Sequence, residues 1–150
     1  MRRARAADAT EVAALVGAYA AEELLLPRTP AHIALAIDDY VVATDARGRV
    51  LACAALREYS PSLAELVSVA TTREAQRRGL GRLVVAGAER LALQRGYASL
   101  FAHTVSPEFF AAIGYQPADR ALFPEKAARD HTLCVRRDLV AVDDALAVAA

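Results

Sequence analysis

The spacing of apolar residues along the chain changes several times between a helical repeat and a strand repeat. Apolar positions three and four residues apart predict helices, whereas alternation and short β-branched runs predict strands. The predicted helices cover residues 8–23, 30–37, 82–91 and 107–112. The predicted strands cover residues 40–44, 49–58, 65–71, 97–104, 115–120 and 131–139. This order predicts an α/β (α+β) fold, in which helices flank a mixed sheet with antiparallel and parallel parts.

Polar and proline-containing segments indicate where several of these elements begin. Asp8, followed three residues later by Glu11, resembles a capping box, which predicts that Asp8 caps the first helix. Thr29 precedes Pro30, a pair that favours the N-cap and the first position of a helix. The segment 45–48 reads Asp-Ala-Arg-Gly between two strand patterns and predicts a hairpin turn.

The chain length limits the number of domains. With 150 residues, the chain can form one hydrophobic core but is too short for two ordinary domains. No repeat or low-complexity linker interrupts the pattern. We therefore predict one domain over residues 1–140, followed by an alanine-rich C-terminal tail over residues 141–150.

The most informative segment, residues 76–81, reads Gln-Arg-Arg-Gly-Leu-Gly and lies between a buried-strand pattern and a helix pattern. A glycine-containing loop at a helix N-terminus offers unpaired backbone N–H groups and the positive end of the helix dipole, which together favour phosphate binding. The segment lacks the third glycine of a dinucleotide fingerprint and the Gly-Lys-Ser/Thr of a Walker loop. The alternative is an ordinary strand-to-helix turn that contains two glycines.

Charge favours a small anionic ligand. The chain carries 18 basic and 18 acidic residues, so it has no general attraction for nucleic acid or an anionic membrane. Four arginines nevertheless surround the glycine-containing loop: Arg73, Arg77, Arg78 and Arg82. Such a local basic cluster in a neutral protein favours an anionic ligand. The alternative is a solvated basic surface.

The cysteines and histidines suggest no metal site. Cys53 and Cys134 lie in apolar strand patterns, as expected for buried, reduced core residues of a cytoplasmic protein. The three histidines, His32, His103 and His131, lack ligand spacing. No apolar run reaches membrane-spanning length, and no N-terminal signal pattern is present.

The loop and the element order together resemble the GNAT acyltransferase superfamily over residues 2–120, and more specifically the acyltransferase domain of N-acetylglutamate synthase. Segments 24–29, 52–56, 64–66, 100–104, 109–115 and 123–126 carry the closer resemblance. It implies a single GNAT-like domain whose mixed, mostly antiparallel sheet contains a splayed parallel pair, with acetyl-CoA as acyl donor. The residues that we expect to bind acetyl-CoA are Val69, Ala70, Thr71, Gln76, Arg77, Arg78, Gly79, Leu80, Gly81 and Arg82.

Two departures from the family pattern concern the acceptor and the leaving group. After Lys126 the family carries a longer Tyr-Asn-x-Gln-Arg-x-Ser-Lys stretch, whereas this chain has only residues 127–132, in which His131 and Thr132 could replace the arginine and the serine. Many GNAT enzymes have a tyrosine, the proposed general acid, at the position of Phe110. As in the synthase subgroup, that acid is missing here.

Acetyl transfer from a thioester to an amine needs a base, a polarised carbonyl and an oriented acceptor. Glu65 is the predicted general base, acting through a water, because alternation along its strand would put it on the same face as Val69. Glu58 and His103 are alternatives. Backbone N–H groups near Val69 and Thr71 are expected to form an oxyanion hole.

An amino-acid acceptor needs a cation for its carboxylate. Arg28 and Lys126 fit this role and match family positions, and we assign Thr104 to the same site. The alternative is that these cations are solvated surface groups.

We therefore predict an N-acetyltransferase for L-glutamate or another amino acid, acting by direct transfer. Alternative acceptors are another small amine or a protein amine, and a non-catalytic acyl-CoA-binding regulatory module is the alternative of a different class. The hydrophobic content of 55% favours a homodimer.

Overall fold

The computed structural model describes residues 1–22, 25, 28–119, 122 and 132–139. The predicted tail over residues 141–150 therefore lies outside the described residues. The described α-helices are α1 (Ala9–Ala20), α2 (Pro30–Leu35), α3 (Leu80–Gln94) and α4 (Pro107–Ala112). The described strands are β1 (Arg2–Arg3), β2 (Tyr40–Thr44), β3 (Val50–Ser60), β4 (Leu63–Thr71), β5 (Ser99–Thr104), β6 (Gln116–Ala118) and β7 (Leu133–Asp138). Short 3₁₀ helices cover Ala6–Asp8, Ile37–Asp39 and Arg73–Ala75.

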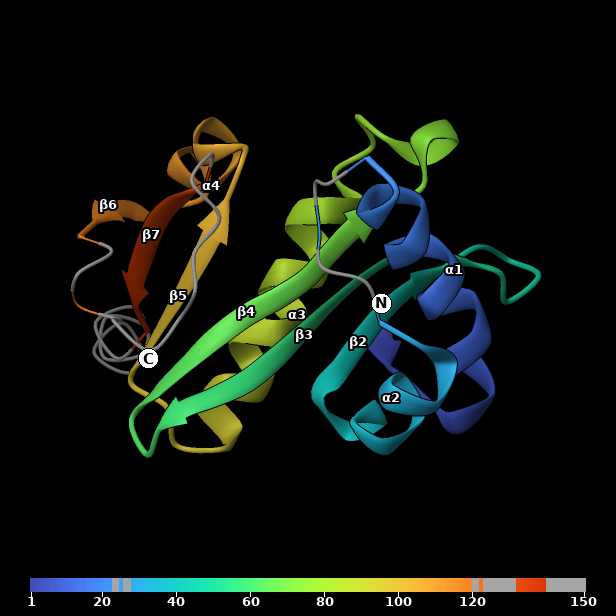
Figure 1. Cartoon of the computed structure of the whole chain (residues 1–150), viewed down its shortest axis with the longest axis horizontal. Coiled ribbons are helices and arrows are strands. Elements are labelled where there is room, and N and C mark those ends of the chain that lie inside the picture. The colour runs from blue at the N-terminus through green and yellow to red at the C-terminus, as the bar shows by residue number, and fades with distance from the viewer. Residues whose placement is uncertain (23–24, 26–27, 120–121, 123–131, 140–150) are drawn as a thin grey trace, which may run out of the picture. The chain divides into compact units, whose positions relative to one another are not determined.

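The described strands form one seven-stranded sheet in the order β1-β2-β3-β4-β5-β7-β6 (Figure 1). β4 and β5 pair in parallel, with Leu63 opposite Ser99 and Glu65 opposite Phe101. The pairs β1–β2, β2–β3, β5–β7 and β6–β7 are antiparallel. The predicted mixed, mostly antiparallel sheet flanked by helices is thus confirmed, while the splay of the parallel pair stays a prediction.

The chain divides into two compact units, the first formed by residues 1–57 and 66–91. In this unit, α1 and α2 pack against one face of β2 and β3. In Figure 1, α3 lies behind β3 and β4. Alternate residues of β2 and β3 supply the buried face toward α1 and α2, as the period of a strand requires. These include Tyr40, Val42, Cys53 and Ala55.

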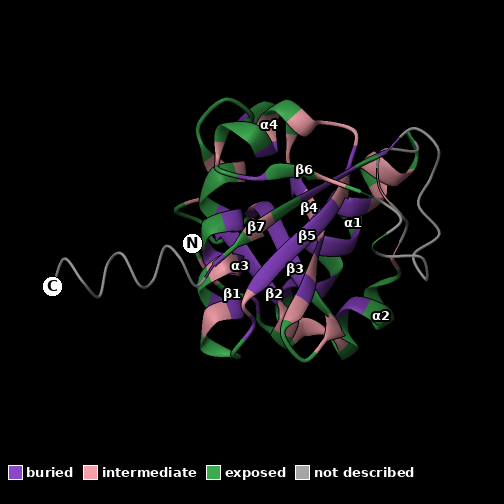
Figure 2. Ribbon diagram, turned by 90° about the vertical axis from the view of Figure 1, so that its left-hand side faces the viewer, coloured by how far each residue is buried: buried purple, intermediate pink, exposed green. Residues whose placement is uncertain are grey.

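The second unit contains residues 58–65 and the described residues from 92 onward. β5 is buried along most of its length (Figure 2). Phe101 is fully buried and packs edge to face against Tyr59, with ring centroids 5.4 Å apart. β7 pairs with β5 on one side and with β6 on the other.

Two short local predictions are confirmed. Thr29 Oγ1 accepts a hydrogen bond from the backbone N–H of His32 at 3.1 Å and caps α2, which begins at Pro30. Asp45 Oδ1 accepts hydrogen bonds from the N–H groups of Arg47 and Arg49, and Gly48 closes the turn with a φ of 82°. Both features depend only on neighbouring residues, so the sequence specifies them locally.

The predicted capping box at α1 is wrong. The Asp8 side chain makes no cap hydrogen bond to α1, because a 3₁₀ turn over Ala6–Asp8 has already made the backbone helical at Asp8. Its carboxylate instead accepts two hydrogen bonds from the Arg2 guanidinium, at 2.8 and 3.0 Å, and one from the Arg5 N–H at 2.7 Å. Glu11 accepts a hydrogen bond from the Val50 N–H at 2.9 Å.

The buried face of α3 also differs from the prediction at one position. The helical spacing of Leu83, Val84, Gly87 and Leu91 predicts that these residues face the core. Val84 and Leu91 are buried as this predicts, but Leu83 is 41% exposed. Val85 and Ala88 are buried instead. The helix begins at Leu80, before the predicted start at Arg82. Its buried face is therefore shifted by one residue from the predicted face.

The buried Asp8–Arg2 pair predicts an acid-sensitive part of the stability. The Arg2 guanidinium, helped by the Arg5 N–H, lowers the pKa of the Asp8 carboxyl. Because the folded pKa lies below the unfolded value of about 3.9, this stabilisation is present above that value and is lost as the pH falls through the folded pKa. We expect Asp8→Asn to have a lower melting temperature than the wild type at pH 7, with the difference shrinking below about pH 4. A difference that stays constant down to pH 2 would contradict this role.

Candidate functional site

The loop between β4 and α3 has an unusual backbone. Arg77 has a φ of 67° and Gly79 a φ of 78°, so two residues close in sequence are left-handed. α3 starts at Leu80, and the Leu83 N–H donates to the Gly79 carbonyl at 3.0 Å. When left-handed residues lie directly before a helix, successive backbone N–H groups point to the same side. Backbone nests bind anions with N–H groups arranged in this way.

Gly79 leaves room for a ligand beside the loop. A side chain at Gly79 would meet no atom within 4 Å, so the space beside its backbone is open. Gly81 lies in the first turn of α3, where the helix dipole favours a negative charge. The residues present therefore fit the pyrophosphate of acetyl-CoA.

The four arginines around the loop have different environments. Arg77, Arg78 and Arg82 are exposed, as expected of cations that meet an anion from solvent. Arg73 forms an ion pair with Glu22 and lies 5.1 Å from the centre of the Tyr19 ring. Arg73 is exposed as well, but its charge is partly balanced by Glu22.

β4 contains a left-handed residue in its middle. Ser68 has a φ of 55°, a conformation that costs about 1–2 kcal/mol for a residue with a Cβ. Two buried partners contact it: the Tyr40 hydroxyl lies 3.2 Å from Ser68 Oγ, and the Cys53 thiol donates to the Ser68 carbonyl at 3.1 Å. Burial raises the pKa of Cys53 to about 12, so the thiol stays protonated and able to donate.

The turn at Ser68 interrupts the alternation of β4. Val67 and Ala70 are three residues apart and yet both pack against the core of α1, α2, β2 and β3. In a regular strand, residues separated by an odd number point to opposite faces. The alternation that we used to place Glu65 and Val69 on one face therefore does not extend across Ser68.

Arg28 lies within electrostatic range of this turn. Burial raises the pKa of the Tyr40 hydroxyl, and the positive charge of Arg28 partly opposes that rise. Arg28 is half-buried. Arg28 and the predicted oxyanion donors of β4 thus belong to the same unit, and Tyr40 is the residue that both Arg28 and Ser68 affect. Lys126 lies outside the described residues.

The predicted site residues of the second unit have other contacts. Glu65 is half-buried in the part of β4 that pairs in parallel with β5, where its partner residue is Phe101. Thr104 Oγ1 accepts a hydrogen bond from the Ser106 N–H at 2.9 Å, which gives it a structural contact before α4. Of the alternative bases, Glu58 accepts a hydrogen bond from the Tyr97 hydroxyl at 2.9 Å, and His103 packs edge to face against Phe101.

Phe110 occupies an aromatic cluster. It is buried and packs edge to face against Phe109 and Tyr115, with ring centroids 5.1 and 5.2 Å away. The Phe110 ring carries no ionisable group, so it cannot protonate a leaving thiolate.

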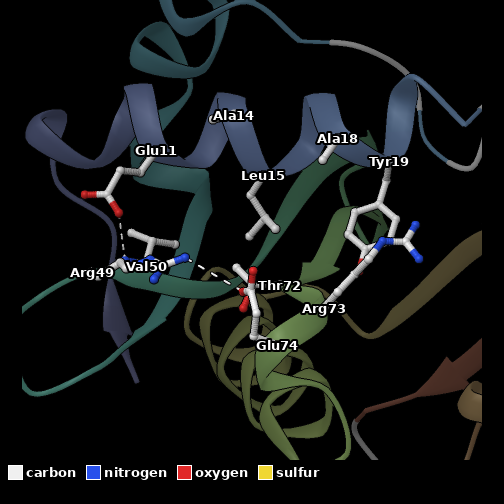
Figure 3. Close-up of a pocket in the computed structure, with 10 residues that line it drawn as sticks. All are labelled: Glu11, Ala14, Leu15, Ala18, Tyr19, Arg49, Val50, Thr72, Arg73 and Glu74. Atoms are coloured by element: carbon white, nitrogen blue, oxygen red, sulfur yellow. Dashed lines mark hydrogen bonds and ion pairs between the residues drawn. The ribbon is translucent and has the colours of Figure 1, made fainter.

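Sequence reasoning missed a pocket of about 380 Å³ beside α1 (Figure 3). Leu15 and Val50 form part of its apolar wall, and Arg49 and Glu74 form an ion pair at 3.8 Å. Tyr19 lies at its other end in Figure 3. The Tyr19 hydroxyl contacts Thr71 at the end of β4 and Gln76 at the start of the loop over residues 76–81. These contacts join residues more than fifty positions apart, so no local signal in the sequence could have revealed them.

No group of three or more His, Cys, Asp or Glu side chains suited to hold a metal ion occurs among the described residues. Cys53 and Cys134 are both buried free thiols, as predicted. None of the described helices combines the length and the apolar character needed to cross a membrane.

Comparison with known proteins shows the family. The profile of the acetyltransferase (GNAT) family matches residues 19–115. A protein of Chlorobaculum tepidum, named as an uncharacterized N-acetyltransferase, is 36% identical over 137 residues, which make up 91% of this chain and 88% of that protein.

Solved structures share the fold. N-acetylglutamate synthase from Neisseria gonorrhoeae, complexed with coenzyme A and N-acetyl-glutamate, matches 92% of this chain with a TM-score of 0.83 and 26% identity. The match covers 34% of that synthase, so this chain spans about a third of its length. Rv2747 from Mycobacterium tuberculosis, solved in complex with CoA, matches 91% of this chain and 97% of its own, with a TM-score of 0.83 and 23% identity. The chain belongs to the acetyltransferase (GNAT) family and is an N-acetyltransferase that uses acetyl-CoA as its acyl donor.

Proposed function

We propose that this N-acetyltransferase transfers the acetyl group to the amino group of a small amino acid, with L-glutamate as the first candidate. The observation that carries the proposal is the half-buried position of Arg28, whose charge acts on the hydroxyl of Tyr40, the buried residue that contacts Ser68 of β4. A guanidinium at this position provides a partner for the carboxylate of an amino acid whose amine approaches the same strand.

In this proposal the loop over residues 76–82 holds acetyl-CoA. Its left-handed backbone and the first turn of α3 provide N–H groups for the pyrophosphate, and Arg77, Arg78 and Arg82 provide positive charge. Residues 69–71 are assigned to the acyl arm. Acetyl-CoA supplies the acetyl group and a thiol leaving group.

The end of β4 is proposed to polarise the thioester carbonyl. The N–H groups near Val69 and Thr71 follow directly after the left-handed Ser68, and Tyr40 and Cys53 hold this turn in place. Donors that are already oriented need no reorganisation during the reaction, which is why fixed N–H groups are effective oxyanion partners.

Glu65 remains the proposed general base, acting through a water on the ammonium group of the acceptor. This assignment no longer rests on strand alternation, because that argument fails at Ser68. Its support is the half-buried position of Glu65 on the strand that also carries the proposed oxyanion donors. Glu58 already accepts a hydrogen bond from Tyr97.

The acceptor site is proposed to include Arg28, Thr104 and Lys126. The Neisseria synthase was crystallised with N-acetyl-glutamate, which supports an amino acid as the acceptor. With glutamate as substrate, the protein would act in arginine biosynthesis in the cytoplasm. We also retain the homodimer as a proposal from composition.

Acetyl-CoA-dependent thiol release tests the proposed acceptor. Release with L-glutamate, but not with polyamines or peptides, supports the proposal. Release only with another small amine or with a protein amine would discard glutamate, and tight CoA binding without release from any amino acid would contradict the proposal.

Replacing Gly81 tests the donor loop. We expect Gly81→Trp to abolish acetyl-CoA binding in calorimetry, because the indole would fill the space at the first turn of α3 that a pyrophosphate needs. Gly17→Trp is the control, since Gly17 lies in α1 with no atom within 4 Å of an added Cβ. Retained affinity in a folded Gly81→Trp variant would mean that the donor site is misplaced.

Replacing Arg28 tests the acceptor site. A hydrogen bond to a charged group contributes roughly 1.5–3 kcal/mol, so we expect Arg28→Ala to raise the acceptor KM at least about tenfold. The KM for acetyl-CoA should change little. Arg90→Ala, which removes an exposed arginine from α3, is the matched control. An unchanged acceptor KM would remove Arg28 from the site.

Replacing Glu65 tests the base. General base catalysis contributes about 10²–10⁴-fold, so Glu65→Gln should lower kcat by at least about a hundredfold while acetyl-CoA still binds. Glu58→Gln serves as the comparison. If Glu58→Gln loses activity and Glu65→Gln keeps it, the two assignments are reversed.

A further inference from the structure

The Tyr19 hydroxyl lies at the centre of a hydrogen-bond chain between α1 and the donor loop. It donates to the Thr71 carbonyl at 2.5 Å and accepts from Gln76 Nε2 at 2.6 Å. Thr71 is the last residue of β4, and Gln76 is the first residue of the loop assigned to the pyrophosphate. One phenol therefore contacts the two ends of the segment that leads into the donor site.

The position of Tyr19 is set by the packing of α1. Val12, Leu15 and Val16 are buried at helical spacing and fix the helix against the core, and the Tyr19 ring packs against the same core. At the pocket, the guanidinium of Arg73 lies over the Tyr19 ring (Figure 3). A tyrosine has only two side-chain torsions, so a packed ring directs its hydroxyl with little loss of entropy.

The two hydrogen bonds of the Tyr19 hydroxyl have the same donor-to-acceptor direction. The Gln76 amide donates to the phenol, and the phenol donates to the Thr71 carbonyl, so each polar atom has a partner of the opposite kind. Removing the hydroxyl would leave both partners without this contact. The start of the loop would then lose its connection to α1.

The neighbouring ion pair between Arg73 and Glu22 is a separate contact. The Arg73 and Glu22 side chains are 60% and 51% exposed. Exposed ion pairs contribute little because water and salt screen them. This pair therefore provides a control at the same place in the structure.

We propose that Tyr19 is a positioning residue for the donor site: its hydroxyl fixes Gln76, and through Gln76 the backbone of residues 77–81, in the conformation that binds acetyl-CoA. Tyr19 acts through Gln76 and does not contact the reacting atoms. The inference rests on the proposed placement of acetyl-CoA at residues 76–82, and it deepens that proposal by naming what holds the loop.

The test is a double-mutant cycle on CoA binding, measured by calorimetry with CoA itself. Tyr19→Phe removes the hydroxyl, and Gln76→Leu removes the amide from the exposed side of the same hydrogen bond. Each variant should raise the Kd about three- to tenfold, as expected for one hydrogen bond. The double variant should bind no more weakly than either single variant, because both remove the same contact.

Kinetics and the matched control separate positioning from general destabilisation. Tyr19→Phe should raise the KM for acetyl-CoA and leave kcat within about twofold, whereas Glu22→Gln should leave the Kd for CoA within about twofold. A lower melting temperature with an unchanged Kd for Tyr19→Phe would overturn the proposal, and so would additive effects in the cycle. CoA binding is read without an acceptor, so a failure of the amino-acid proposal, seen as absent thiol release, is distinguishable from a failure here.

Discussion

A left-handed serine in the middle of β4 is the constraint on which the proposed site depends. Ser68 holds a strained conformation inside an extended strand, and contacts from β2 and β3 stabilise it. Tyr40 reaches Ser68 across β3, where its cross-strand partner is the small residue Ala55. The alanine-rich sequence of β3 is therefore suited to leave space for the tyrosine ring. Strain of this kind persists only where the surroundings fix it, and it concentrates at functional sites.

Left-handed residues occur at two places from β4 to α3, at the turn of Ser68 and in the loop that contains Arg77 and Gly79. Between residues 68 and 80, the chain passes from the turn at Ser68 through the left-handed Arg77 to the start of α3. Tyr40 holds the first part from inside the sheet, and Tyr19 holds the second part from α1. The two tyrosines thus fix the backbone on which we place the acyl group and the pyrophosphate.

Local chemistry in the sequence predicted much of the fold and the donor loop. The hairpin turn, the cap of α2 and the glycine-containing loop depend on neighbouring residues, so they could be predicted. The capping box failed because Arg2, a partner outside the helix, took the Asp8 carboxylate. β1 was missed because two residues carry no recognisable period. The contacts of Tyr19 and Ser68 could not be predicted from the sequence, because they join strands and helices that are far apart in the chain.

Amide hydrogen exchange with and without CoA tests the central claim, that fixed backbone N–H groups of one loop hold the donor. The account predicts that CoA slows exchange at the amides of residues 77–82 more than anywhere else in the first unit, because these N–H groups would bind the pyrophosphate. Saturating CoA with unchanged exchange at these amides, and protection concentrated elsewhere, would contradict it.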